Sequence, residues 1–68
     1  MNKRIMIHTG LIKINGVRES IKLEVAELEA MRKGINERQR ANLEMKIANR
    51  KEWVKELDSI ELELREEL

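Results

Sequence analysis

The sequence predicts a mainly α-helical protein: an antiparallel αα-hairpin, coiled-coil-like with a longer second helix, behind a short N-terminal β-hairpin or extended arm. From Val17 onward, apolar residues recur at spacings of three and four, as on one face of a helix. Gly34 interrupts this pattern near the middle of the 68 residues. The residues before Val17 have a different, isoleucine-rich composition. A chain of this length forms one small domain, residues 1–68.

The first element spans residues 4–14, with the sequence RIMIHTGLIKI. β-Branched residues on both sides of Thr9-Gly10 predict two short strands joined by a tight turn. Asn15-Gly16 supplies a second turn dipeptide at its end. Because a lone hairpin is marginally stable in water, these strands need a surface to pack on. The alternative is a loosely ordered arm.

The second element is a helix over residues 17–33. It carries one apolar stripe at helical spacing: Val17, Ile21, Val25 and Leu28. A second stripe lies on the opposite side: Leu23, Ala26 and Ala30. Two stripes predict a helix that is covered on both faces. Residues 21–25 also alternate as in a strand, but the helix-forming composition of residues 24–33 favours the helix.

Signals for the end of one helix and the start of another surround Gly34. Arg32 and Lys33 precede this glycine, and positive charge is favourable in the last turn of a helix. Asn36 and Gln39 then have the spacing of a capping box. These signals predict an αα-hairpin, and one long helix with an internal glycine is the alternative.

The third element is a helix over residues 36–68. It has a heptad stripe with spacings of three and four: Arg40, Leu43, Ile47, Arg50, Val54, Leu57, Glu61, Leu64 and Leu68. The three charged members either fix the register of the packed face or lie at its edge, with their stems along the apolar surface. A break of this helix near Asp58 is a further alternative to one continuous helix.

The two helix lengths predict an uncovered surface. At about 1.5 Å per residue, a helix over residues 17–33 reaches back along the second helix only to about Arg50. Either the N-terminal strands or another copy of the chain must then cover the remaining apolar segment. We expect an oligomer, most simply a dimer, through this interface: Trp53, Val54, Leu57, Ile60, Leu64 and Leu68.

The net charge of +1 conceals a segregation of charge along the chain. Residues 34–55 carry six bases and three acids, whereas residues 56–68 carry six acids and one base. The basic region offers these candidate contacts to an anion or a nucleic acid: Arg32, Lys33, Arg38, Arg40, Lys46, Arg50 and Lys51. They point in several directions around the helix, and the chain lacks the aromatic platforms on which single strands stack.

The composition offers little for catalysis. With no cysteine and His8 as the only histidine, the chain has neither a usual zinc set nor a nucleophile with a histidine base. The three glycines fit turns and not a phosphate-binding loop. We expect a cytoplasmic protein that is not an enzyme, with no cofactor, no metal and no membrane segment.

These exclusions favour a small protein-interaction module that acts as an oligomeric inhibitor, adaptor or regulator of a larger protein. Small proteins of phages and mobile elements are often of this class. The second hypothesis is a regulator or antitoxin of the ribbon-helix-helix kind, in which paired N-terminal strands would read DNA through Lys3, Arg4 and Lys13. The segment between Thr9 and Gly16 is extra for that arrangement. A third hypothesis is an oligomer that binds a small anion near Gly34.

Overall fold

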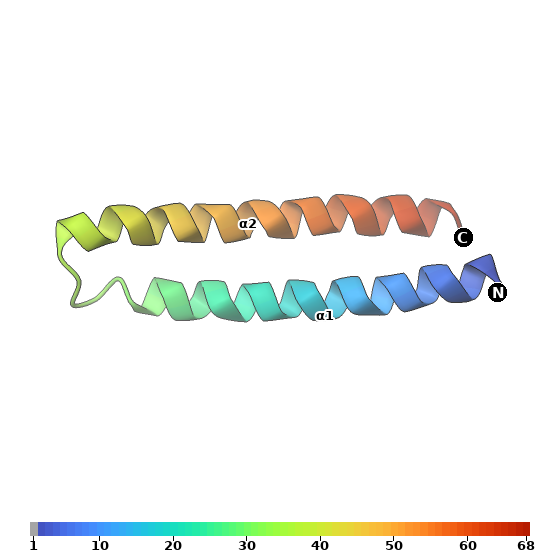
Figure 1. Ribbon diagram of the computed structural model, residues 1–68, viewed down its shortest axis with the longest axis horizontal. Helices are drawn as coiled ribbons and strands as arrows, with labels where there is room; N and C mark the ends of the chain where they lie inside the picture. Colours follow the sequence, from blue (N-terminus) through green and yellow to red (C-terminus); the bar gives the residue numbers. More distant parts are fainter. Residues whose placement is uncertain (1) are drawn as a thin grey trace.

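The computed structural model describes residues 2–68 and confirms a helical hairpin. Helix α1 spans Lys3–Ala30 and helix α2 spans Glu37–Glu66. The two helices lie side by side in antiparallel directions, so both ends of the chain lie at the end of the rod opposite the turn (Figure 1). The rod measures 53 × 15 × 13 Å. In the part of the chain that is described, neither helix has the length and apolar character needed to cross a membrane.

Asparagine side chains begin both helices. The Asn2 side chain accepts a hydrogen bond from the Arg4 amide at 2.8 Å, and Asn36 accepts one from the Gln39 amide at the same distance. The second cap is the one expected from the capping box. Gly34 has a φ of +84°, a left-handed conformation that favours glycine, and it lies in the turn between the helices. Helix α1 ends at Ala30, three residues before the predicted end.

The predicted strands over residues 4–14 are wrong, because this segment is the first part of α1 and residues 2–68 contain no strand. The predicted helix start at residue 17 is wrong for the same reason. Ile7 and Leu11 extend the helical apolar stripe toward the N-terminus, and both are buried. Packing of this stripe against α2 overrides the local β-propensity and the glycine at position 10, since propensities are worth only about 1 kcal/mol per residue.

The two helices meet along a heptad seam. The α1 side of this seam consists of Ile7, Leu11, Ile14, Arg18, Ile21, Val25 and Leu28. The α2 side is the stripe expected from the sequence, and Leu43 and Ile47 are buried there. Val25 forms a core cluster with these two residues, and Ile21, Leu28 and Ile35 pack around it. This cluster lies toward the turn end of the rod, while Ile7 and Leu11 are buried toward the other end.

Helix α1 is only two residues shorter than α2, so it covers more of α2 than the sequence indicated. A Cβ placed on Gly10 would lie 3.6 Å from the Cδ1 atom of Leu64, which shows that α1 follows α2 well beyond Arg50. The expectation that α2 lacks a helix opposite it beyond Arg50 is therefore wrong. Val54, Leu57 and Leu64 are half-buried in the seam.

Replacing Ile47 by valine should lower the free energy of unfolding by about 1 kcal/mol, because one methylene group leaves a fully packed site. Ile47 is 3% exposed, whereas Ile12 is 73% exposed. Ile12→Val is the matched control, since it makes the same change in helix propensity without emptying a packed site. Urea unfolding followed by circular dichroism measures both. Equal stability of the two variants would contradict this packing.

Candidate interaction surface

The seam has two flanks of opposite character, formed by the residues directly beside it on each side of the rod. We call one the polar flank; its residues are all polar or charged: His8, Asn15, Lys22 and Glu29 on α1, and Glu44, Lys51, Asp58 and Arg65 on α2. We call the other the apolar flank, after its central residues: Gly10 and Val17 on α1, and Trp53 and Ile60 on α2. Toward its two ends this flank continues through Lys3, Glu24, Met31, Gln39, Lys46 and Glu67. Only the apolar flank presents hydrophobic side chains next to the seam, so it is the candidate interaction surface.

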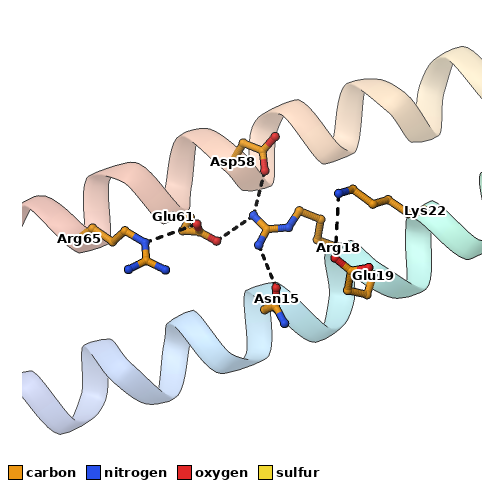
Figure 2. Close-up of polar contacts among 7 residues, drawn as sticks. All are labelled: Asn15, Arg18, Glu19, Lys22, Asp58, Glu61 and Arg65. Carbon is orange, nitrogen blue, oxygen red and sulfur yellow. Dashed lines mark hydrogen bonds and ion pairs between the residues drawn. The ribbon is translucent and has the colours of Figure 1, made fainter.

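A partly buried ion-pair layer crosses the seam on the side of the polar flank. The Arg18 guanidinium lies 2.9 Å from Asp58 Oδ1 and 2.7 Å from Glu61 Oε1, and it donates a hydrogen bond to Asn15 Oδ1 at 2.9 Å (Figure 2). Arg65 approaches the other oxygen of Glu61 at 3.4 Å. The Arg18 side chain is only 15% exposed and that of Glu61 only 20%. Arg18 and Glu61 are thus two charged seam residues paired with each other, and this pairing favours one register of α1 against α2.

Two arginines lower the pKa of the carboxylates they contact. The hydrogen bond from Arg18 holds the pKa of Glu61 below its usual value of 4.5. The guanidinium of Arg32 contacts both carboxylate oxygens of Glu44, at 2.6 and 2.8 Å, and this hydrogen bonding likewise lowers the pKa of Glu44. Both acids are therefore bound as carboxylates in the folded hairpin.

On the apolar flank, two contacts in series hold the ring of Trp53. Arg50 Nε donates a hydrogen bond to Glu24 Oε1 at 2.7 Å, which joins the two helices. The same guanidinium lies 4.3 Å from the centroid of the Trp53 ring, at cation–π distance. Arg50 is a seam residue with a side chain only 22% exposed. The ring is held in place by this contact and still remains 43% exposed.

Val17 and Ile60 continue this surface toward the termini. Glu24 lies opposite Arg50, and Gly10 lies opposite Leu64. In this register Val17 stands on α1 at a level between Trp53 and Ile60 on α2. Val17 is 50% exposed and Ile60 is 45% exposed. The predicted place of Val17 in the buried stripe of α1 is therefore wrong, and the residue belongs to the candidate surface.

The structure divides the six residues of the sequence-predicted interface into two sets. Trp53, Ile60 and Leu68 are exposed, between 43% and 45%. Val54, Leu57 and Leu64 lie in the seam and are half-covered by α1. Trp53 and Ile60 stand beside the seam, whereas Leu68 is the last position of the heptad stripe and follows the end of α2.

The basic residues singled out in the sequence do not form one site. Arg32 and Arg50 are engaged with acids on the opposite helix. Five others are exposed at different positions around the turn and α2: Lys33, Arg38, Arg40, Lys46 and Lys51. Lys46 lies beside the apolar flank and Lys51 is on the polar flank, so these two point to opposite sides of the rod.

The outer face of α1, directed away from α2, carries three large apolar residues that the sequence does not predict on one face. Ile5, Ile12 and Leu23 are exposed at 58, 73 and 63%. The second stripe predicted on α1 already contained Leu23. Extending this stripe toward the N-terminus by alternate steps of four and three residues reaches Ile12 and Ile5. Both residues lie in the segment 4–14, which the sequence predicts as strands and not as part of the helix.

Within residues 2–68, no cluster of three or more histidine, aspartate or glutamate side chains is arranged to hold a metal ion. Comparison of the chain with protein-family models, with curated proteins and with solved structures finds no match.

Acid should weaken the hairpin through Glu61 and Glu44. Their pKa values are lowered in the folded state, so their contribution to stability is complete above the ordinary value of 4.5 and is lost as the pH falls through the lowered values. Arg18→Gln removes the larger cause of the Glu61 shift and should reduce the loss of stability between about pH 5 and pH 3.

Urea unfolding over this pH range measures the effect. Lys22→Gln is the matched control, because it removes one positive charge from the polar flank, at an exposed contact of 4.0 Å with Glu19. The control should keep the wild-type pH dependence. Identical pH dependence of the wild type and Arg18→Gln would contradict the role given to the Arg18–Glu61 pair.

Proposed function

We propose that this chain is a non-enzymatic protein-interaction module that works in the cytoplasm as an oligomeric inhibitor, adaptor or regulator of a larger protein. One observation carries the proposal. Eleven large hydrophobic residues in residues 2–68 are at least 43% exposed, whereas five are buried. Burying such side chains against another protein is favourable by about 25 cal/mol per Å² of apolar area.

The arrangement of these residues supports a contact with protein better than a contact with a small molecule. Six of the eleven exposed side chains lie on two surfaces: Val17, Trp53 and Ile60 on the apolar flank, and Ile5, Ile12 and Leu23 along the outer face of α1. Both are elongated surfaces on a rod 53 Å long. Such surfaces fit other helices, which pack through rows of side chains spaced three and four residues apart.

The two other hypotheses have weaker support. A ribbon-helix-helix protein needs an N-terminal strand to enter DNA, and in this chain residues 4–14 are helical. An anion site near Gly34 would have to use the exposed Lys33 and Arg38, since Arg32 is held by Glu44 and Glu29.

The proposal predicts that the immobilised hairpin retains a specific protein from its native cell lysate through the outer face of α1. The double variant Ile12→Glu with Leu23→Glu should reduce retention at least tenfold, since each large apolar side chain contributes about 1.5–3 kcal/mol when buried. The amount of the retained protein is measured by quantitative mass spectrometry.

The control adds the same two charges at exposed polar positions, Asn49→Glu with Ser59→Glu. It should retain the partner as the wild type does. The proposal fails if the wild type retains nothing above the double variant, or if both double variants lose the partner equally.

A further inference from the structure

We infer that a second copy of this chain covers the apolar flank, and that the two hairpins form an antiparallel four-helix assembly around a two-fold axis. This inference deepens the self-association included in the proposed function. It is carried by three features of the molecule: the difference between the flanks, the accessible area and the arrangement of charge.

The flank positions distinguish a helix pair that is complete alone from one that packs on a further layer. A two-stranded coiled coil needs apolar residues only in its seam, whereas helices in a four-helix bundle extend the apolar face to one flank. Here one flank is polar at every position, while the other holds Val17, Trp53 and Ile60 at its centre. The hairpin thus has the apolar pattern of half a bundle, with the open side at the apolar flank.

The accessible area agrees with a missing partner. A compact folded monomer of 8.1 kDa exposes about 4,500 Å² by the usual scaling with mass. This hairpin exposes 5515 Å², about 1,000 Å² more than that scaling gives. A stable dimer of standard size buries about 800 Å² on each partner. The surplus is therefore large enough for one interface with a second copy.

The charge on each helix changes sign along its length. In α1, residues 3–17 carry three bases and no acid, and residues 18–30 carry two bases and four acids. In α2 and the residues that follow it, positions 45–56 carry four bases and two acids, and positions 57–68 carry one base and five acids. An antiparallel second copy, with α1 on α1 and α2 on α2 and with the two-fold axis near Val17, places each of these basic segments against an acidic one. This complementarity supports a second copy as the occupant.

The heptad spacing aligns the apolar flank with itself in this arrangement. When Trp53 of one copy lies opposite Ile60 of the other, Lys46 lies opposite Glu67, because both pairs are centred on the same point of α2. Val17 lies beside Val17 of the second copy at nearly the same level. The outer face of α1 is a poorer self-contact, since Glu19 at its centre would meet its own copy.

The first experiment measures mass by analytical ultracentrifugation of the full chain over a concentration series up to about 100 µM. The wild type should approach twice 8.1 kDa. Val17→Glu with Ile60→Glu should raise the dissociation constant of the dimer at least tenfold. Met45→Glu with Leu62→Glu is the control: it adds the same charge at side chains 71 and 61% exposed on the outer part of α2, and it should leave the dimer intact.

The emission of Trp53 gives a readout that does not depend on any variant. It is the only aromatic residue of the chain, so its emission should shift to shorter wavelength as concentration rises and the ring is buried. A monomer at every concentration, or a dimer that only the control variant disrupts, would overturn the inference. Neither result would affect the lysate test, which reports on a different protein.

The second experiment measures the arrangement of the two copies. The chain has no cysteine, so Ala30→Cys carries a single spin label at an exposed position near the turn. In the antiparallel assembly the two labels are about 40 Å apart, since each lies 13 residues from Val17 at 1.5 Å per residue. Double electron–electron resonance measures this distance. A separation of about 20 Å or less would place the two turns together and overturn the antiparallel arrangement.

Discussion

The contact of Arg18 with Asp58 and Glu61 is the constraint on which the rest of the hairpin depends. A seam built from aliphatic residues repeats every seven positions, so its apolar contacts alone do not distinguish the observed register from one shifted by a heptad. A partly buried charged pair does distinguish them, because a shift would leave Arg18 and Glu61 half-buried without these partners. The pair therefore contributes specificity even if its net contribution to stability is small.

This register determines what the surface presents. With Arg18 fixed at the level of Asp58, Glu24 reaches Arg50, and Arg50 in turn lies over the ring of Trp53. The exposed ring is thus positioned by two ion-pair layers that are themselves partly buried. A ring held in this way loses less side-chain entropy when a partner covers it than a freely rotating one would.

Much of the second half of the hairpin was predictable from the sequence, because its signals agree with each other. The heptad of α2 is long, free of glycine and proline, and begins at an asparagine cap, so period and capping indicate the same helix. The first fourteen residues lacked such agreement. Thr9-Gly10 and the isoleucines indicated strands locally, and only the partner helix, which supplies a surface for Ile7 and Leu11, makes the helical spacing decisive.

The length of α1 also changes the reason for which the interface residues are exposed. The sequence predicts a first helix too short to cover Trp53 and Ile60, whereas α1 does cover α2 there, and these two residues are exposed because they stand on a flank of the seam. The spacing of apolar residues in one helix does not show which of them lie in the seam and which lie on a flank. That assignment also needs the register of the opposite helix. Without that register, the sequence predicts Val17 in the same stripe as Val25. It also predicts Gly10 in the turn between two strands.

The hairpin has one turn, at Gly34, and this gives its contacts an order in folding. Each layer of contacts further from the turn closes a longer loop of chain. The layer of Val25 and Leu43 closes a short loop, and the layer at the level of Gly10 and Leu64 closes a loop that contains most of the chain. Folding is therefore expected to start beside the turn and proceed toward the termini, with the Arg18 layer forming midway. A hairpin in a shifted register can then persist only until the Arg18 layer forms. The contacts of Arg18 thus select the register during folding as well as in the final structure.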